Sequence, residues 1–252
     1  TIVGTGKDGL ITANDVEKAA QGLSDGNTGL MIKETIPLNH VKRAMAENMS
    51  TSWQTIPQFT QIVSVNMDSV LKVKKELSHV SINDILVKTV ANVIRNHTIV
   101  NSTLEDNKII VYEDINISVA VNSEQGLVVP VVRNADQKSV GEISNAIKEL
   151  SDKAKSNKLS PEDYANGTIT ISNLGSLGIE SGTPIINHPQ STIIFAGSIQ
   201  KTPIVTEDDE IRIAPMMKLS ICYDHRFIDG VTAAGFTNGV KDALENLSVN
   251  HL

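Results

Sequence analysis

The chain has 252 residues, of which 40% are hydrophobic and 20% charged, the composition of an ordinary globular protein with one large core or one core and a small appendage. Its net charge of −7 argues against nucleic acid and anionic membrane surfaces as main partners, and it contains neither a run of 18 apolar residues nor a secretory signal pattern. The single cysteine, Cys222, excludes an internal disulfide and fits a reducing compartment.

Residues 1–33 are predicted to form a small N-terminal unit and a linker. A glycine-punctuated turn runs from Gly4 to Gly9, and Asn14 or Asp15 can cap a short helix that ends at Ala20. Residues 22–29 are rich in Gly, Ser, Asn and Asp, as flexible linkers are. Because a segment of about 20 residues cannot bury a stable core, this unit is either a fragment or folds onto another surface.

Helical and strand patterns alternate from residue 34 onward. Predicted helices cover residues 38–53, 69–77, 140–154 and 231–247, and one more begins at Ser81. Predicted strands cover residues 59–65, 115–121, 127–132, 168–172, 192–196 and 218–223. Since helices and strands intermix through one domain, the predicted class is α/β with a mixed sheet.

The segment from Asp224 to Gly230 carries the strongest chemical signal in the chain. It follows a β-type run that ends at Tyr223 and precedes the last predicted helix. A histidine at the end of a buried strand suits proton transfer, because imidazole titrates near neutrality and the strand fixes its position. A lone histidine is more often a surface or packing residue, so the surrounding blocks of sequence decide between the two interpretations.

Those blocks together resemble the catalytic domain of the dihydrolipoamide acyltransferases, the core component of 2-oxo acid dehydrogenase complexes. They are Arg43–Ser50 with Ile56–Thr60, Asn116–Val121 with Gly126–Val131, Gly167–Ser176, Pro184–Pro189 and Asp224–Gly230, in the order of the family. The resemblance implies a chloramphenicol-acetyltransferase-like mixed-sheet fold and a trimer with active sites between subunits, assembled into a 24-mer or a 60-mer. It divides the chain into a partial peripheral subunit-binding domain (1–21), a linker (22–33) and an acyltransferase catalytic domain (34–252).

The resemblance implies catalytic roles for three residues. His225 would be the general base that takes a thiol proton, a role worth about 10²–10⁴ in rate. Ser172 matches a serine whose hydroxyl donates to the tetrahedral oxyanion, worth about 10²–10³, although outside the family it would be no more than a serine at a strand end. Asp229 is interpreted as an organiser of the catalytic loop, ahead of a Ser-His-Asp relay, and no metal is expected.

Matching positions also imply a channel for coenzyme A. They are Lys74, Ser81, Asn122, Ser172, Asn173, Ser176, Gly197 and Ile199. Lys74 would meet the nucleotide end, although a solvated helix lysine is an equally good interpretation, and Ser81 opens a helix whose N-terminus suits a phosphate. Arg226 is interpreted mainly as an ion-pair partner, and Cys222 as buried apolar filler rather than an acyl carrier.

The sequence departs from the family pattern at four places, and those near the acyl pocket leave the acyl group open. Gln58 stands where many relatives carry His, and residues 179–182 replace a Gly-Gly-aromatic run that helps to form the acyl pocket. Asn122 replaces an acidic residue, and Leu10 stands where the subunit-binding domain usually has Arg. Acetyl, branched-chain and succinyl groups therefore all remain candidates, and docking of partners through residues 1–21 is uncertain.

The predicted function is acyl transfer between dihydrolipoamide and coenzyme A, both as substrates, within a 2-oxo acid dehydrogenase complex. The lipoyl group is expected on a domain outside this chain. Expected partners are further copies of the chain, the 2-oxo acid dehydrogenase component and the dihydrolipoamide dehydrogenase component, in a bacterial cytoplasm or a mitochondrial matrix. Two alternatives stay open: a scaffold core with weak catalysis, and a stand-alone CoA-dependent acyltransferase for another small acceptor.

Overall fold

The computed structural model describes residues 5–17, 31–123 and 126–252. Proximity of Cα atoms divides the chain into two compact units, residues 1–38 and residues 39–252. Residues 13–17 are helical, and the rest of the predicted helix up to Ala20 lies outside the described residues, as does the predicted linker at 22–29. Within the described parts, no helix combines the length and the apolar character that crossing a bilayer requires.

A single carboxylate organises the described part of the first unit. Asp15 is buried and accepts hydrogen bonds from the backbone N–H and the hydroxyl of Thr5, and from the same two groups of Thr12. The short 3-10 turn η1 (Lys7–Gly9) lies between these threonines and ends at Gly9, whose φ of +79° is the left-handed region that favours glycine. The turn and the helix at 13–17 are thus tied together at one side chain.

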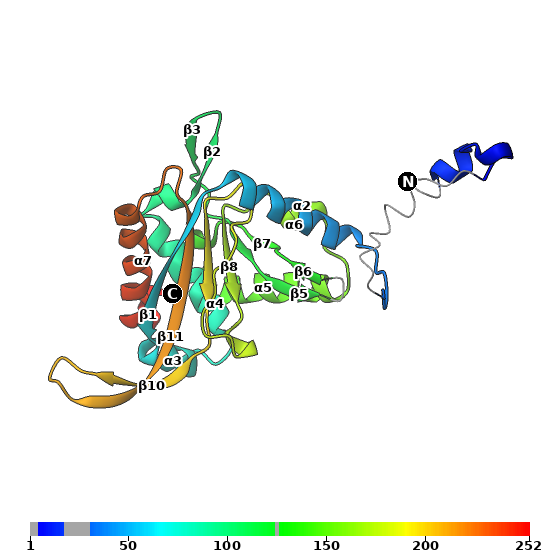
Figure 1. Cartoon of the computed structure of the whole chain (residues 1–252). Helices are drawn as coiled ribbons and strands as arrows, with labels where there is room; N and C mark the ends of the chain where they lie inside the picture. The colour runs from blue at the N-terminus through cyan, green and yellow to red at the C-terminus, as the bar shows by residue number, and fades with distance from the viewer. Residues whose placement is uncertain (1–4, 18–30, 124–125) are drawn as a thin grey trace. The chain divides into compact units, whose positions relative to one another are not determined.

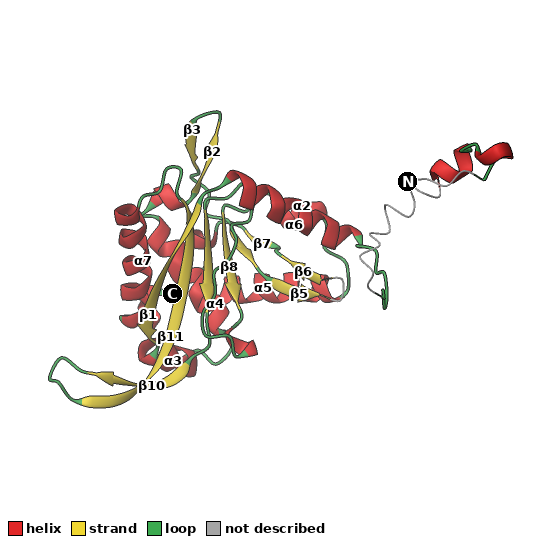
Figure 2. Ribbon diagram, in the orientation of Figure 1, coloured by secondary structure: helices red, strands yellow, loops and turns green. Residues whose placement is uncertain are grey.

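The second unit is built on a mixed sheet (Figures 1 and 2). Its strands lie in the order β1 (Gln58–Asn66), β11 (Ile211–Asp224), β9 (Thr192–Ala196), β8 (Ile169–Asn173), β4 (Ile117–Val119) and β7 (Val131–Val132), and β10 (Gln200–Val205) also pairs with β11. β8 runs parallel to β4 and to β9, whereas the other pairs are antiparallel. The predicted mixed-sheet α/β class is confirmed.

Helices cover the two faces of this sheet unequally. The main core lies on the face of α3 (Asp68–Glu76), α4 (Ile82–Ile94), α5 (Val140–Lys155) and α7 (Gly230–Glu245). Alternation along β11 sends Ile221 and Tyr223 into that core, while Cys222 joins a small second cluster with Ile56, the residue that ends α2 (His40–Thr55). The face that carries α2 therefore holds little apolar packing and remains available for chemistry.

The remaining elements are short. They are α6 (Pro161–Tyr164), the 3-10 turns η2 (Thr98–Val100), η3 (Ala135–Gln137), η4 (Gly175–Leu177) and η5 (Val249–His251), and two hairpins, β2 (Ser102–Glu105) with β3 (Lys108–Val111) and β5 (Val121–Ser123) with β6 (Gly126–Val128).

Two predicted strands were wrong in extent. Residues 115–121 and 127–132 each divide between the main sheet and the β5–β6 hairpin. Pro130 lies at the break and lacks an N–H, but its carbonyl still accepts from Val119. The β2–β3 hairpin was not predicted, although Asp106 and Asn107, both with positive φ, supply the turn chemistry that could have indicated it.

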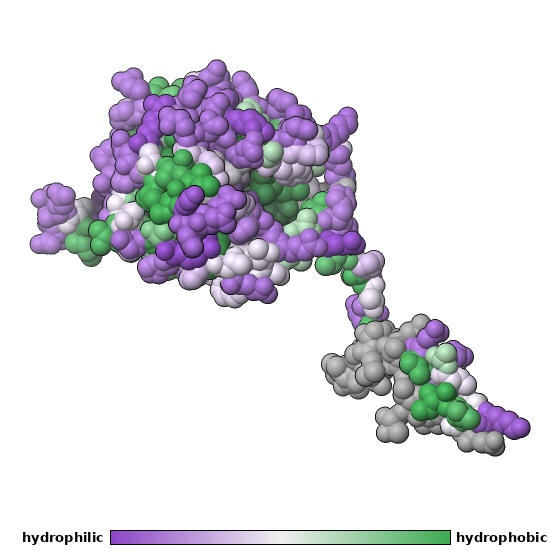
Figure 3. Space-filling view, turned by 90° about the horizontal axis from the view of Figure 1, so that it is seen from above, coloured by the Kyte–Doolittle hydropathy of each residue, from purple (hydrophilic) through white to green (hydrophobic). Residues whose placement is uncertain are grey.

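The surface of the second unit is mostly hydrophilic but carries apolar patches, visible in the view from above (Figure 3). Large apolar side chains that are exposed in this unit include Trp53, Ile62, Ile213 and Val231. Apolar patches on an isolated protomer mark surfaces that contact other molecules.

Candidate functional site

His225 is held by groups from two separate parts of the chain. Its backbone N–H donates to the carbonyl of Pro57 at 2.8 Å, and its ring lies 4.3 Å from the Phe59 ring, measured between centroids. Its Nδ1 lies 3.1 Å from the carbonyl oxygen of Ile228. Because a carbonyl only accepts, that contact requires the hydrogen on Nδ1, so in the neutral ring Nε2 is the free acceptor. The residue as a whole is exposed, which leaves Nε2 accessible to a substrate.

The residues that flank His225 form an ion pair. Asp224 is 1% exposed and accepts from Nε and Nη2 of Arg226, with the shortest contact at 2.6 Å. The backbone N–H of Arg226 also donates to Asp224. The predicted ion-pair role of Arg226 is confirmed, and its partner is a buried carboxylate that fixes the turn after β11.

Asp229 lies at the N-terminus of α7. Its carboxylate accepts from the backbone N–H of Thr232 at 2.8 Å. Hydrogen bonds from Thr232 are the main cause that lowers the pKa of the Asp229 carboxyl, and the nearby His225 acts in the same direction. Since Asp229 bonds to the helix end and Nδ1 of His225 bonds to Ile228, the geometry favours the loop-organising interpretation over a relay.

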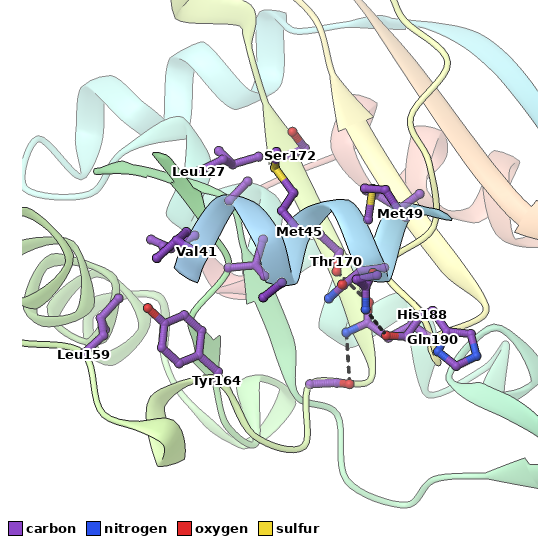
Figure 4. Close-up of a pocket in the computed structure, with 18 of the residues that line it drawn as sticks. Val41, Met45, Met49, Leu127, Leu159, Tyr164, Thr170, Ser172, His188 and Gln190 are labelled. Atoms are coloured by element: carbon purple, nitrogen blue, oxygen red, sulfur yellow. Dashed lines mark hydrogen bonds between the residues drawn. The ribbon is translucent and has the colours of Figure 1, made fainter. Parts of the chain in front are cut away.

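Ser172 lies near the end of β8, on the face of the sheet that carries α2. It lines a cavity of about 1160 Å³ together with Thr170 of the same strand and with apolar residues of α2, among them Val41, Met45 and Met49 (Figure 4). Leu127, Leu159 and Tyr164 add further apolar surface. The hydroxyl of Ser172 therefore borders a largely apolar space, in which a hydrogen bond to a developing oxyanion is strong.

A buried amide that the sequence analysis missed fixes the floor of this cavity. Gln190 accepts from the hydroxyl of Thr170 at 2.5 Å, and its amide nitrogen donates to the Ser118 hydroxyl and the Gly167 carbonyl (Figure 4). A Cβ on Gly167 would lie 2.1 Å from the Ser118 oxygen, so any larger residue would force this network to shift. The glycine that begins the block Gly167–Ser176 was the available signal.

Ser172 and His225 do not meet within one protomer. Ser172 pairs with Phe195 of β9, which pairs with Ser220 of β11, five residues before His225. Five residues span about 17 Å along a strand and two strand spacings add about 10 Å across, so the two residues are roughly 20 Å apart. They also face opposite sides, because Ser172 borders the α2 cavity while His225 packs on Phe59, which contacts the main core.

Two of the residues predicted to hold coenzyme A border a smaller cavity of about 300 Å³ between α3, α4 and α5. They are Lys74, which donates to the Ser78 carbonyl, and Ser81, the N-cap of α4. His79 and Lys148 add positive or titratable groups there. The buried Asp84 carboxylate already accepts from the Ser81 N–H at 2.6 Å. A phosphate bound at the N-terminus of α4 would therefore lie beside a negatively charged carboxylate.

The other predicted coenzyme A residues fall into two places. Asn173, Ser176 and Gly197 cluster at the end of β8. A Cβ on Gly197 would lie 1.9 Å from the Glu180 carbonyl, and Asn173 donates to Asn83 in the first turn of α4. Ile199 is half-buried against the core. Asn122 is exposed on the separate β5–β6 hairpin, so it is not brought to the cluster at the end of β8.

Cys222 and Gln58 have structural surroundings. Cys222 is 2% exposed, and burial raises the pKa of its thiol. Gln58 donates to the Ser52 hydroxyl and accepts from the Ile186 N–H at 3.0 Å. These contacts join α2, β1 and the segment before β9, and they account for an amide at position 58.

Comparison with known proteins gives a family match over most of the chain. The family model described as 2-oxoacid dehydrogenases acyltransferase (catalytic domain) matches residues 31–252. The dihydrolipoyllysine-residue acetyltransferase component of the pyruvate dehydrogenase complex of Rickettsia bellii is 35% identical over 259 residues, 97% of this chain and 62% of that protein. The mitochondrial component from Dictyostelium discoideum is 37% identical over 218 residues, 84% of this chain and 34% of that protein. The chain thus spans about a third to just under two-thirds of these curated relatives.

Solved structures agree with this match. The dihydrolipoamide acetyltransferase of Azotobacter vinelandii, studied for the catalytic role of a serine, a histidine and an asparagine, is similar at a TM-score of 0.82 and 30% identity, over 88% of this chain and 95% of that chain. The cubic core of a pyruvate dehydrogenase multienzyme complex gives 0.82 and 30%, over 87% and 94%. Chloramphenicol acetyltransferase gives 0.54 and 18%, over 84% and 100%, which bears on the fold alone. The predicted chloramphenicol-acetyltransferase-like fold is confirmed.

Proposed function

The chain belongs to the 2-oxoacid dehydrogenase acyltransferase family, and from that premise we propose that it transfers an acyl group between dihydrolipoamide and coenzyme A. The observation that carries the proposal is the setting of His225. Its Nδ1 is committed to the Ile228 carbonyl, and its accessible Nε2 is free to accept a proton. We propose His225 as the general base and Ser172 as the oxyanion donor. Asp229 is proposed as the residue that fixes the loop between His225 and α7.

The proposed reaction needs one proton acceptor and one fixed donor. A thiol of pKa about 8.5 is only a few per cent thiolate at neutral pH, so Nε2 takes the S–H proton as the sulfur attacks the thioester carbonyl. The C–S bond forms, the carbonyl electrons move to oxygen, and the Ser172 hydroxyl donates to that oxyanion. When the intermediate collapses, the other C–S bond breaks and Nε2 returns the proton to the leaving sulfur, which makes the transfer reversible.

Residue spacing supports these assignments. In the Azotobacter protein, the serine and the histidine studied for their catalytic role stand 52 residues apart, and the asparagine follows the histidine by four. Here Ser172 precedes His225 by 53 residues, and Asp229 follows it by four. An aspartate therefore occupies the place of that asparagine, and its contact with the end of α7 suits the organising role proposed for it.

We propose that the complete site forms between two copies of the chain. Within one protomer Ser172 and His225 are roughly 20 Å apart, too far for one thioester carbon to reach both. The exposed apolar residue Val231 lies in the first turn of α7, directly after the His225 loop. A neighbouring copy that covers this residue would bring its Ser172 cavity to His225. A trimer, and its assembly into a 24-mer or 60-mer, follow the precedent of the cubic core structure.

The remaining assignments rest on the family and on the sequence. We propose residues 1–21 as part of a peripheral subunit-binding domain, 22–33 as a linker and 34–252 as the catalytic domain. Coenzyme A would contact Lys74, Ser81, Asn122, Asn173, Ser176, Gly197 and Ile199, and the lipoyl group would arrive on another domain. The proposed partners are the dehydrogenase and dihydrolipoamide dehydrogenase components. The relatives include bacterial and mitochondrial proteins, so a bacterial cytoplasm or a mitochondrial matrix is proposed.

A steady-state assay tests the function. The purified chain, given acetyl-CoA and free dihydrolipoamide, is expected to form the acyl thioester, and His225→Ala is expected to lose about 10³-fold or more in kcat. His251→Ala, which removes an exposed histidine of η5, is the matched control and should retain full activity. Isobutyryl-, isovaleryl- and succinyl-CoA identify the acyl group. Transfer that survives His225→Ala would refute the mechanism, and no turnover with any of the four donors would refute the function.

A further inference from the structure

Phe59 forms the closest aromatic contact of the catalytic histidine. The ring centroids of Phe59 and His225 are 4.3 Å apart and their planes are inclined by 38°. Phe59 also lies 5.6 Å from the Tyr223 ring, measured between centroids, and its half-buried side chain packs against the main core. The imidazole therefore lies on an aromatic ring that the core holds in place.

Pairing of β1 with β11 creates this contact. Phe59 is registered opposite Tyr223, and the neighbouring Pro57 accepts the His225 N–H at 2.8 Å. Three restraints thus act on the histidine: a backbone hydrogen bond to the residue before β1, the Ile228 carbonyl at Nδ1, and the Phe59 ring against the imidazole. The first fixes the backbone, the second fixes the tautomer and the Nδ1 edge of the ring, and the third supports the face of the ring.

We propose that Phe59 is a positioning residue for acyl transfer, which sets the direction of Nε2 of His225 and stabilises the ring while it carries the thiol proton. This inference rests on the proposed function of His225. In the transition state the imidazole gains positive charge next to the π face of Phe59, and a cation is attracted to an aromatic face. A ring that acts as the base carries no charge before the proton moves, so the attraction acts mainly after the transfer and therefore lowers the barrier.

Phe59 also packs in the core, so the test must separate its two roles. Phe59→Leu keeps most of the apolar volume and removes the aromatic face, whereas Phe59→Tyr keeps the face. Val63→Ala is the matched control. Val63 lies on the same strand and is half-buried against the same core, but it stands four residues farther along β1 from the contact with His225. Each variant is made in the whole chain, and its thermal unfolding is recorded alongside the kinetics.

The expected results follow from action through His225. Phe59→Leu should lower kcat about tenfold, with KM for acetyl-CoA and dihydrolipoamide unchanged, since a few kT of transition-state stabilisation is lost and no substrate contact is. Phe59→Tyr should keep most of kcat, and Val63→Ala should keep all of it. In a His225→Ala background, Phe59→Leu should leave the residual rate unaltered, because the group on which it acts is absent.

Three outcomes would overturn the inference. An equal loss in Phe59→Leu and Phe59→Tyr, or a loss from Phe59→Leu that persists in the His225→Ala background, would show a purely structural role. An unchanged kcat in Phe59→Leu would reject the inference while leaving the proposed function intact. If His225→Ala alone keeps full activity, the proposed function fails first, and the two failures are therefore distinguishable.

Discussion

Cys222 and His225 stand three residues apart and have opposite surroundings. Cys222 points into the small apolar cluster beside α2 and is 2% exposed, so burial raises the pKa of its thiol. His225 follows the last strand residue into an exposed turn, where Nε2 is accessible. A nucleophilic cysteine requires a thiolate and access, whereas a general base requires only a free acceptor within reach. These surroundings favour His225 over Cys222 for the proposed catalytic role.

This difference predicts the effect of removing the thiol. Cys222→Ala should retain acyl transfer within about twofold, because no acyl group passes through a thiol that is buried and protonated. Loss of the buried sulfur should lower the free energy of unfolding by about 1 kcal/mol. Both quantities are measured on the same preparation, by thioester formation and by urea unfolding. An acyl adduct on Cys222 in rapidly quenched samples would contradict direct transfer between the two substrates.

At this scale the sequence predicts the local contacts of a residue better than the distant ones. The block Asp224–Gly230 was sufficient to place a histidine at a strand end, and its pairing with Ile228 is local. The contact with Phe59 depends on the register between β1 and β11, and the ties of Gln190 depend on loops brought together by β4, β8 and β9. Neither follows from a pattern along the chain, because long-range register is set by tertiary packing.

Among the elements, β8 is held by buried polar contacts on the face that carries the cavity. Its residues Thr170 and Ser172 border the large cavity. Hydrogen bonds of Gln190 to Thr170, Ser118 and Gly167 tie the strand to its neighbours. The sequence located this strand to within one residue but divided the neighbouring segments wrongly, because the break at Pro130 sends residues into the separate β5–β6 hairpin. Strand pairing partners, and not intrinsic preference, decided those boundaries.

The crowding beside β8 predicts a sharp contrast between two glycines. Gly167→Ala would place a methyl group 2.1 Å from the Ser118 oxygen and 3.1 Å from the Gln190 amide, so overpacking should cost about 1–3 kcal/mol in unfolding free energy. Gly141→Ala on α5 has its nearest neighbour at 3.9 Å and should instead stabilise the protein by about 0.5–1 kcal/mol. Denaturant titration of both variants measures the difference, and equal effects would show that the Gln190 network yields without cost.

The turn and helix of residues 5–17 predict a pH dependence of their own. Hydrogen bonds from Thr5, and then from Thr12, hold the pKa of the Asp15 carboxyl well below its ordinary value near 3.9. Because the folded pKa is the lower one, the ionised carboxylate stabilises this unit fully above the unfolded pKa, and the stabilisation is lost as pH falls toward the folded pKa.

Amide chemical shifts of residues 5–17, followed by NMR on the whole chain, should therefore be constant from about pH 7 to 5 and change below about pH 4. Asp15→Asn removes the titrating group and should abolish this transition while weakening the unit at every pH. If the variant titrates as the natural chain does, Asp15 is not the group responsible, and the tie between Thr5 and Thr12 has another origin.

For the whole molecule, the decisive property is that neither half of the proposed site works alone. One protomer supplies the proposed general base at the end of β11. The proposed oxyanion donor lies roughly 20 Å away on the other face of the sheet, beside a largely apolar cavity. In a ring of copies joined head to tail, the base of each chain would serve the cavity of the next. Chains with different defects can then complement one another.

Complementation is therefore the strongest test of the assembled site. Ser172→Ala alone should lose about 10²–10³ in kcat and His225→Ala alone about 10³ or more. When the two variants are co-expressed in equal amounts, a contact is intact wherever His225 of a Ser172→Ala chain meets Ser172 of a His225→Ala chain. With random assembly this occurs at about one contact in four, so the mixture should recover about a quarter of the natural activity, far above either variant.

Mixing the separately purified variants without subunit exchange is the control and should recover none. If the co-expressed mixture is no more active than its better component, Ser172 and His225 act within the same chain. The proposal of a site between two copies would then be wrong.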